Sequence, residues 1–398
     1  MNAYIRGNRD LIKQMNRNLL LNILRREGQL SRKQLTEMSG LSVGSVSGLV
    51  AELMAQKWLI ELGEGDFTGG RRQTMIKLNP RAGYAMGIKL MENRAIIAIT
   101  DFESTILEYY DRPILPEPDR RKIVDQLVAA IQSVLDESHI ELDRLFGIGI
   151  GLAGVVNSKE GLIHYSPFFG WREFSLAQAL EQKIDYPVYV ENDVNTLTLT
   201  EQLFGVGSHV ENFVVITVGR GIGLGIVINN QLYNGIRGGA GEFGHMVVWD
   251  KNNLDDPFAY VTIEEIAADP AIVAKMAAFQ EDGCVITDLR DVVAQASAGN
   301  KKAIELLAES GTQIGAGVAN VINLLNPELI IISGEGTIAG DFRHKPLVDA
   351  IQRYTFDGLL EGVEIVVEPT DDRAWARGAA SLVISKVFES PIVEGSFI

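Results

Sequence analysis

The sequence predicts an α/β protein in which a small basic head precedes a much larger acidic body. Charge is distributed unevenly, because residues 1–80 hold 12 Lys and Arg against 7 Asp and Glu, whereas the remaining residues hold 24 against 45. The head shows helical apolar spacing followed by strand-like alternation, and the body alternates strands with helices. With 398 residues the chain is long for one core, so we expect two or three domains.

The composition is that of an ordinary globular protein, with 46% hydrophobic and 22% charged residues. No apolar run approaches the roughly 20 residues that a membrane-spanning helix needs, and the N-terminus lacks the apolar segment of a signal peptide. We therefore predict a cytoplasmic protein with no membrane partner. The one cysteine, Cys284, cannot form an intramolecular disulfide, and we expect an inert, partly buried thiol.

The first 55 residues predict three helices. Residues 8–27 place apolar side chains at helical spacing and end near Gly28. Ser31 and Gln34 have the spacing of a capping box, which predicts the start of a second helix that breaks at Gly40. A third helix is predicted to start at Ser42. Two short helices joined by a tight turn are typical of a helix-turn-helix.

The third helix is predicted to be the DNA-recognition helix. Its buried stripe consists of Val46, Leu49, Val50 and Leu53. Its exposed residues are all small and would let the backbone approach the floor of a major groove: Val43, Gly44, Ser45, Ser47 and Gly48. Together with the positive charge of the head, this pattern predicts DNA contacts from Ser42, Gly44, Ser45 and Ser47.

Residues 58–78, "WLIELGEGDFTGGRRQTMIKL", alternate apolar and polar residues on both sides of a glycine-rich turn and predict a β-hairpin wing. Arg71 and Arg72 fall at its tip, where paired arginines suit a phosphate or a narrow minor groove. The alternative is a solvated turn. A head used only for protein contacts is a further alternative.

From residue 84 the body predicts two halves, each of which opens with a β-hairpin. The first starts with "YAMGIKL" and "RAIIAIT", and its turn is Met91–Glu92–Asn93; the second starts with "NFVVITVGRGIGLGIVINN". This repetition indicates an internally duplicated, two-lobed fold with a ligand cleft between the lobes.

Three segments supply polar groups suited to such a cleft. Asn192 and Asp193 follow a predicted strand, Glu242 and His245 lie among close glycines, and Glu264 starts a helix. Carboxylates, an amide and an imidazole suit a polyhydroxylated ligand, since each carboxylate can accept bonds from two vicinal hydroxyls. Each residue has a structural alternative: Asn192 and Asp193 as helix caps, His245 as a core histidine, and Glu264 as a surface carboxylate.

Together these segments resemble the ROK family, named for repressors, open reading frames and sugar kinases. The combination of "GGAGEFGH" with "END" carries the resemblance, which covers almost the whole chain and points to the branch of xylose- and N-acetylglucosamine-repressor-like regulators. It implies an actin/hexokinase-like, ribonuclease H-like body and sugar contacts from Asn192, Asp193, Glu242, His245 and Glu264. It also brings Gly154 and Ser166 to the sugar, on the weaker segment "GIGIGLAGVVN".

The implied domains are a winged helix-turn-helix over residues 1–80 and a ROK domain over residues 81–398. The N-lobe would comprise residues 81–190 with the C-terminal helix at about 373–390, and the C-lobe residues 191–372.

The chain departs from the family kinases where they hold ATP. Their Asp-x-Gly-Gly-Thr turn holds phosphates, but here Lys89 replaces the aspartate and Met91–Glu92–Asn93 replaces the glycines and threonine. Arg220 in "GRGIG" replaces a usual threonine and could hold an anionic group, which leaves a phosphorylated sugar open. In the kinases the residue matching Asp193 is the catalytic base. We therefore expect no kinase activity and no bound ATP.

A second departure concerns the family's structural zinc, held by the motif histidine and three cysteines. Asp255, Pro257 and Thr262 occupy the cysteine positions here, so His245 and Asp255 fall short of four ligands. We predict no zinc. Packing of Trp249, Phe258 and Tyr260 would hold this loop instead.

The sequence thus predicts a sugar-responsive transcriptional repressor of carbohydrate-utilisation genes, with a non-catalytic sugar pocket and xylose or an amino sugar as the class of effector. The expected partners are operator DNA, the sugar, and further copies of the chain in a homodimer or homotetramer. One alternative is a ROK sugar kinase carrying a DNA-binding head. The other is a protein-docking regulator with a vestigial pocket.

Overall fold

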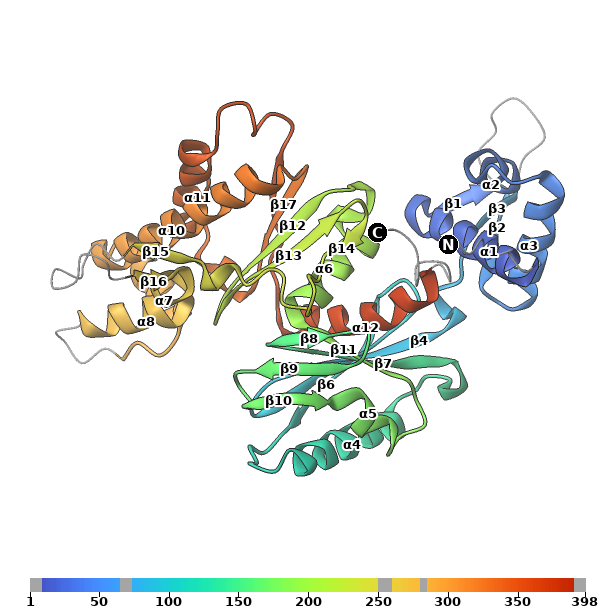
Figure 1. Cartoon of the computed structure of the whole chain (residues 1–398), viewed down its shortest axis with the longest axis horizontal. Helices are drawn as coiled ribbons and strands as arrows, with labels where there is room; N and C mark the ends of the chain where they lie inside the picture. The colour runs from blue at the N-terminus through green and yellow to red at the C-terminus, as the bar shows by residue number, and fades with distance from the viewer. Residues whose placement is uncertain (1–8, 65–73, 250–259, 280–284, 390–398) are drawn as a thin grey trace, which may run out of the picture. The chain divides into compact units, whose positions relative to one another are not determined.

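The structure, a computed structural model, describes residues 9–64, 74–249, 260–279 and 285–389. The chain forms two compact units (Figure 1). Unit 1 consists of residues 1–153, 157–209 and 375–398, and unit 2 of residues 154–156 and 210–374. The head therefore belongs to the same unit as the first sheet of the body. Cys284 lies outside the described residues, as do Asp255, Pro257 and Phe258 of the loop for which we predict no zinc.

The head contains the three predicted helices and the two strands of the predicted hairpin. Its elements are α1 (Arg9–Glu27), β1 (Gln29–Ser31), α2 (Arg32–Ser39), α3 (Val43–Ala55), β2 (Leu59–Glu64) and β3 (Thr74–Leu78). The strands form an antiparallel sheet in the order β1-β3-β2. The tip between β2 and β3, with Arg71 and Arg72, lies outside the described residues.

Local sequence signals determine where the head helices begin and end. Ser31 and Gln34 form the predicted capping box at the start of α2. Gly40 ends α2 with a left-handed φ of 67°, a conformation that glycine adopts without the steric cost of a Cβ. Ser42 caps α3. The axes of α2 and α3 are bent by 120° across this short turn, as in a helix-turn-helix.

The body of unit 1 is built on a five-stranded sheet in the order β11-β7-β4-β5-β6. Its strands are β4 (Tyr84–Leu90), β5 (Arg94–Thr100), β6 (Ile106–Pro113), β7 (Leu145–Leu152) and β11 (Val188–Asn192). The other elements are α4 (Arg120–Glu137), β9 (Leu162–Ser166), β10 (Trp171–Ser175), α5 (Leu176–Glu181) and α6 (Asp193–Phe204). From Trp375 onward, α12 (Asp372–Phe388) also belongs to this unit, and β8 (Val155–Asn157) lies where the chain passes between the units.

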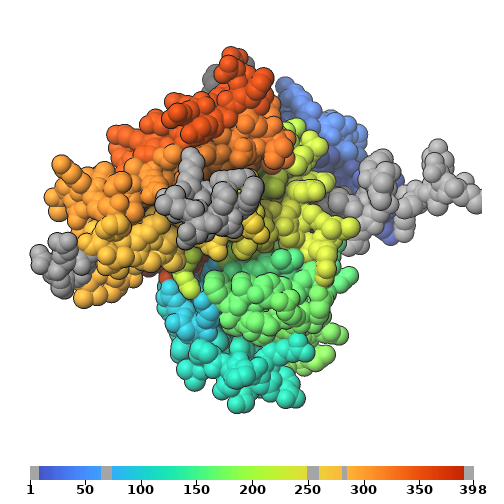
Figure 2. Space-filling view, turned by 60° about the vertical axis from the view of Figure 1, so that its left-hand side comes forward, coloured from blue at the N-terminus to red at the C-terminus, as the bar shows by residue number. Residues whose placement is uncertain are grey.

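Unit 2 repeats this topology with the strand order β14-β13-β12-β17-β18. Its strands are β12 (Phe213–Val218), β13 (Ile222–Ile228), β14 (Gln231–Leu232), β17 (Leu329–Ser333) and β18 (Glu364–Val367), with the hairpin β15 (Val247–Trp249) and β16 (Tyr260–Thr262). Its helices are α7 (Ile263–Ala267), α8 (Asp269–Ala278), α9 (Leu289–Ser297), α10 (Lys301–Leu325) and α11 (Asp341–Tyr354). In the space-filling view of Figure 2 this part of the chain is coloured from yellow to orange-red.

The two sheets confirm the predicted duplication. In each, an antiparallel hairpin starts the sheet, β4 with β5 and β12 with β13. A later strand then joins the first strand in parallel, β7 and β17 respectively, and a further strand joins that one in parallel, β11 and β18. The C-lobe was predicted to begin at residue 191, whereas the structure groups α6 with unit 1. The physical reason is close packing within that unit, since a Cβ on Gly378 of α12 would lie 3.0 Å from the Thr196 carbonyl carbon of α6.

Glycines let α12 approach the sheet of unit 1 closely. A Cβ on Gly87 of β4 would lie 2.0 Å from the Ala376 carbonyl oxygen, and one on Gly149 of β7 would lie 1.9 Å from that of Ala379. Both distances are far below van der Waals contact. These two positions therefore require glycine for α12 to lie on the sheet.

One apolar core joins the head to the body of unit 1. Buried residues of α1, α2, α3 and the head strands form a single cluster with Phe102 after β5 and with the C-terminal half of α12. Phe102 lies 5.2 Å from Trp58 of the head and 5.1 Å from Phe388 of α12, centroid to centroid. Trp58 also stacks on Phe146 of β7 at 5.5 Å. The head is therefore packed onto the body through buried aromatic contacts.

Among the described residues no single helix is long and apolar enough to cross a membrane; only α2 and α3 taken together reach that length and apolarity.

Replacing Phe102 with alanine should lower the free energy of unfolding of unit 1 by about 3–5 kcal/mol, because the side chain is fully buried at the junction and leaves a cavity. Urea unfolding followed by tryptophan fluorescence measures the change. Phe356→Ala is the matched control: Phe356 is 72% exposed, so its loss should change stability by less than about 0.5 kcal/mol. Equal losses in the two variants would contradict a shared core.

Candidate functional site

The predicted DNA-contacting residues lie together on the exposed side of α3. Ser42, Gly44, Ser45 and Ser47 are all exposed, as are Val43 and Gly48, whereas the predicted buried stripe is buried. A Cβ on Gly44 or Gly48 would have no protein atom closer than 4.0 Å, so this face is open. Ser42 also has a structural role, because its hydroxyl accepts the Ser45 backbone N–H at 3.2 Å and caps α3.

Asn192 and Asp193 lie at the junction of β11 and α6, which is where the sheet ends and a helix starts. The Asn192 carboxamide oxygen accepts the backbone N–H of Val194 at 2.9 Å and of Asn195 at 3.3 Å, so the capping role left open by the sequence is real. Asp193 is 7% exposed, and one of its carboxylate oxygens also accepts the Val194 N–H. Helix α6 therefore begins with a carboxylate and an amide held in place by its own first turn.

The other carboxylate oxygen of Asp193 forms an ion pair with Lys89 of β4. The two side chains are only 13% and 10% exposed, and the Lys89 ammonium also lies 4.4 Å from the ring centroid of Trp375 in α12. The positive charge of Lys89 therefore lies against one oxygen of the Asp193 carboxylate, while the Val194 N–H lies against the other.

Glu242 and His245 lie on a 3₁₀ turn, Phe243–His245, of unit 2. Phe243 is buried against Gly317 of α10 and anchors this turn, whereas the Glu242 and His245 side chains are exposed. The His245 Nδ1 lies 3.4 Å from the Glu242 carboxylate, and the His245 side chain is 67% exposed. The alternative interpretation of His245 as a core histidine is therefore wrong.

Glu264, at the start of α7, lies against the same turn and against the second glycine loop. Its carboxylate accepts the backbone N–H of Ile222 at 2.8 Å. A Cβ on Gly221 would lie 2.8 Å from this carboxylate and one on Gly244 3.1 Å from it. Glu264 is thus a half-buried residue whose carboxylate lies between two glycine-containing segments and contacts both. It is not simply a surface carboxylate. Unit 2 brings Glu242, His245 and Glu264 together.

The two weaker sugar candidates differ in accessibility. Ser166, in β9, is fully buried, and its hydroxyl donates to the Ala153 carbonyl at 2.9 Å. It therefore holds the segment before Gly154 in place. Gly154 has a φ of 143°, a conformation that favours glycine. Gly154 belongs to unit 2 and Ser166 to unit 1.

An acidic side chain lies in or beside each of the two loops that resemble phosphate-binding loops. The first is the predicted tight turn after β4, in which the Met91 backbone N–H donates to the Arg94 carbonyl at 2.9 Å, and it contains Glu92. In the second loop the Arg220 backbone N–H donates to the Glu335 carboxylate at 3.1 Å. A Cβ on Gly219 would lie 2.3 Å from this carboxylate, so Glu335 fills the space beside the loop.

Protein contacts hold the described ends of the loop for which we predict no zinc. Strands β15 and β16 pair antiparallel, with Val247 opposite Thr262. The Thr262 hydroxyl, at a position where the family kinases have a cysteine, accepts the Glu265 backbone N–H at 3.2 Å and caps α7. The hydrogen bonds that Thr262 returns to the Glu265 carboxylate lower the pKa of that group. Tyr260 is 68% exposed, so this residue does not pack in the core.

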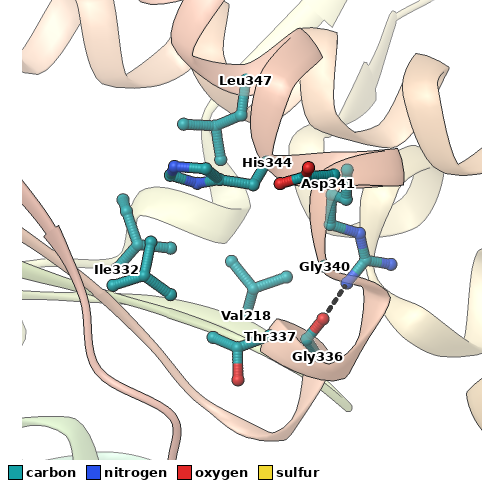
Figure 3. Close-up of a pocket in the computed structure, with 10 residues that line it drawn as sticks. Val218, Ile332, Gly336, Thr337, Gly340, Asp341, His344 and Leu347 are labelled. Atoms are coloured by element: carbon teal, nitrogen blue, oxygen red, sulfur yellow. Dashed lines mark hydrogen bonds between the residues drawn. The ribbon is translucent and has the colours of Figure 1, made fainter.

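Unit 2 also has an apolar recess of about 220 Å³ beside the second glycine loop (Figure 3). Its wall is formed by Val218, Ile332, Gly336, Thr337, Gly340, Asp341, Arg343, His344, Leu347 and Val367. Arg343 is buried and donates to Asp269 at 2.8 Å and to the Gly336 carbonyl at 3.1 Å, which fixes one side of the recess. Burial raises the pKa of Asp269, and the guanidinium opposes this effect. The recess contains none of the residues predicted to bind sugar.

Sequence reasoning identified Lys89 as a departure from the kinases but missed its two contacts, with Asp193 and with Trp375. These residues are 104 and 286 positions away along the chain, so no local pattern could connect them. Glu335 was missed for the same reason. The sequence contained one signal for the Trp375 contact. Lys89 lies two residues after Gly87, so both are on the same face of the strand, and Gly87 marks the face that α12 covers.

Replacing Glu264 with alanine should destabilise unit 2 by about 1.5–3 kcal/mol even without ligand, because the Ile222 N–H loses a charged acceptor. Thermal unfolding measures the loss. Glu309→Ala, at an exposed position of α10, is the control and should change stability by less than about 0.5 kcal/mol. If both variants unfolded like the wild type, the carboxylate would have no bracing role.

Comparison with known proteins gives a consistent result. Residues 85–386 match the ROK family. A protein named putative xylose repressor from Caldicellulosiruptor sp. (strain Rt8B.4) is 28% identical over 395 residues, which cover 97% of this chain and 99% of the relative. A protein from Escherichia coli (strain K12) named DNA-binding transcriptional dual regulator NagC is 30% identical over 386 residues, which cover 95% and 94%.

Two solved structures share the fold. A ROK family transcriptional regulator, described as a homolog of the E. coli MLC protein, aligns with a TM-score of 0.81 at 24% identity, covering 95% of this chain and 97% of that one. A ROK family glucokinase from Streptomyces griseus, in complex with glucose and AMPPNP, aligns with a TM-score of 0.62 at 26% identity, covering 75% and 99%. This chain belongs to the ROK family.

Proposed function

We propose that the chain is a sugar-responsive DNA-binding transcriptional regulator, and specifically a repressor of carbohydrate-utilisation genes. The observation that carries the proposal is the open, small-residue face of α3 on a head whose core is continuous with the unit that contains Asp193. Relatives named as a putative xylose repressor and as a DNA-binding transcriptional dual regulator align over nearly the full length of this chain, head included, which supports the same conclusion.

In this proposal α3 enters a major groove, and Ser42, Gly44, Ser45 and Ser47 approach the base edges. Arg71 and Arg72 would contact the adjacent backbone or minor groove. A homodimer, or a homotetramer built from two dimers, would present two heads to a symmetric operator. The cytoplasm is the proposed location.

The proposed sugar ligands are Asn192 and Asp193 in unit 1 and Glu242, His245 and Glu264 in unit 2, with lesser roles for Gly154 and Ser166. Xylose or an amino sugar is the proposed effector class. The exposed Glu242 and His245 side chains have hydrogen-bonding capacity directed outward. Ser166 would act only indirectly, because its hydroxyl is buried and bonded to the Ala153 carbonyl.

We propose that the pocket is not catalytic and holds neither ATP nor zinc. Three features support the absence of phosphoryl transfer: Lys89 pairs with Asp193, the first loop has Glu92 in place of glycine, and Glu335 accepts the amide of the second loop. The two carboxylates oppose a polyanionic donor, and the Lys89 ammonium occupies the carboxylate that would have to accept the proton. At the zinc position, Thr262 already caps α7. Without catalysis, a bound sugar can act only by favouring one conformation of the chain.

One observation keeps the kinase alternative testable. The apolar recess beside the second glycine loop has walls suited to a flat ring. Nucleotide binding there would favour the enzyme over the regulator. The docking alternative predicts instead that no sugar alters the chain.

Replacing Gly44 with glutamate should lower operator affinity at least about 30-fold, because it places a bulky anion on the face proposed to meet DNA. The probe is a duplex selected from random sequences by the wild-type chain, and binding is measured by fluorescence anisotropy. Thr312→Glu in α10 adds the same charge at an exposed helical position of unit 2 and is the control. Similar affinities for both variants would argue against α3 as the reading helix.

A thermal-shift panel of D-xylose, D-glucose, N-acetyl-D-glucosamine and the 6-phosphates of the last two should identify an effector. At 100 times its dissociation constant, the true ligand stabilises the chain by about 2.7 kcal/mol. Asp193→Asn should abolish the shift at that concentration, whereas Asp341→Asn, an exposed carboxylate on the apolar recess, should retain it. Steady ATP-dependent phosphorylation of any sugar in the panel would instead establish the kinase.

A further inference from the structure

Helices α6 and α12 each have one end near Lys89 and the other end on the DNA-binding head. The N-terminal residue of α6 is Asp193, and Trp375 lies in the first turn of α12. Lys89 contacts both, as an ion pair with the carboxylate and at 4.4 Å from the indole centroid. One ammonium therefore joins the starts of two helices.

The two helices are fixed to each other along their length. The Thr200 hydroxyl of α6 donates to the Ser381 hydroxyl of α12 at 3.0 Å, and both residues are buried. The Ser104 hydroxyl, after β5, lies 2.9 Å from that of Ser381. At Gly378 the backbones approach so closely that a Cβ would lie 3.0 Å from Thr196. A displacement of one helix must therefore displace the other.

The far ends of both helices contact one face of α1 in the head. Arg25 donates to the Leu203 carbonyl in the last turn of α6 at 2.5 Å. Asn22 donates to the Phe388 carbonyl of α12 at 2.9 Å, and Asn18 donates to the Glu389 carbonyl just after it at 2.5 Å. Residues 18, 22 and 25 are spaced by four and three, so they share one face of α1.

The Arg25 contact is costly to break. Burial lowers the pKa of Arg25 to about 10, and the neighbouring Arg26 adds to this effect, yet the guanidinium remains charged at neutral pH. A buried cation needs its acceptors, which are here the Leu203 carbonyl and the ring of Phe388 at 5.5 Å. Because α6 is 12 residues, or about 18 Å, long, Asp193 and this contact are ends of one helix.

We propose that Lys89 is the positioning residue through which the sugar pocket controls the head, with α6 and α12 as the mechanical link to α1. This proposal rests on the proposed function. A sugar hydroxyl that bonds to Asp193 competes with the Lys89 ammonium and changes the contact that holds the starts of α6 and α12 together. The head then follows, because both helix ends are attached to it. By linkage, if sugar binding changes operator affinity by a given factor, operator binding changes sugar affinity by the same factor.

The first test compares Arg25→Leu with Arg26→Leu. Arg26 is the adjacent residue, half-exposed and paired with Glu27, so it is a matched control in the same helix turn. For each variant the operator dissociation constant is measured with and without a saturating amount of the sugar that gives the largest thermal shift. The sugar response is the factor by which saturating sugar changes the operator dissociation constant. We expect this factor to be at least about fivefold smaller in Arg25→Leu than in the wild type, and unchanged in Arg26→Leu. Asn22→Ala, which removes the hydrogen bond to the Phe388 carbonyl and one to the Asn18 carbonyl within α1, replaces Arg25→Leu should that variant unfold.

The second test concerns Lys89 itself. In Lys89→Met, the factor by which saturating sugar changes the operator dissociation constant should be at least about fivefold smaller than in the wild type. Lys89→Arg, which keeps the positive charge, should retain most of the wild-type response. Lys302→Met is the control, since Lys302 also pairs with a carboxylate, Glu305, and lies 4.5 Å from an aromatic ring, that of Phe279. Sugar should change the tryptophan emission of the wild type, and Trp375→Phe should remove that change.

The outcomes separate the two proposals. Suppose that the wild type binds operator and responds to sugar. If folded Lys89→Met, and Arg25→Leu or Asn22→Ala, then keep the full response, the helix link is overturned and the proposed function stays intact. A wild type that responds to no sugar in the panel would overturn both.

Discussion

The apolar core that the head shares with the first sheet is the constraint on which the architecture depends. A helix-turn-helix of this size has few residues with which to build its own core, and here Trp58 and the leucines of α1 complete it against Phe102, Phe146 and Phe388. Because these contacts are buried, the head cannot move as an independent, flexibly tethered domain. Any change in its position must involve the elements on which it packs, above all α6 and α12.

Two charged side chains lie against the residue and the loop that resemble parts of the catalytic site of the family kinases. Lys89 places a cation against Asp193, and Glu335 places an anion against the second glycine loop. In the proposed function, these contacts let the scaffold keep side chains suited to a sugar without suiting the transfer of a phosphoryl group.

Much of the fold could be predicted because its signals are local. The capping box at Ser31 and Gln34, the left-handed Gly40 and the N-cap Ser42 each act within a few residues, and the structure shows all three. The stripe from Val46 to Leu53 has helical spacing and is buried accordingly. The boundary between the lobes was harder to place, since the assignment of α6 to unit 1 depends on contacts with Gly378, far away in the chain.

The sequence by itself determined the order of the elements, the duplicated α/β design, the basic head and the residue types available for a sugar, because periodicity, capping and composition are properties of neighbouring residues. Only the tertiary structure decided what those side chains do. It showed Asn192 as a helix cap, Glu264 as a bracket between glycine loops, and Ser166 as a buried donor. It also paired Asp193 with Lys89 and brought Trp375 to the same ammonium, since such contacts depend on how strands and helices pack and leave no trace in local sequence.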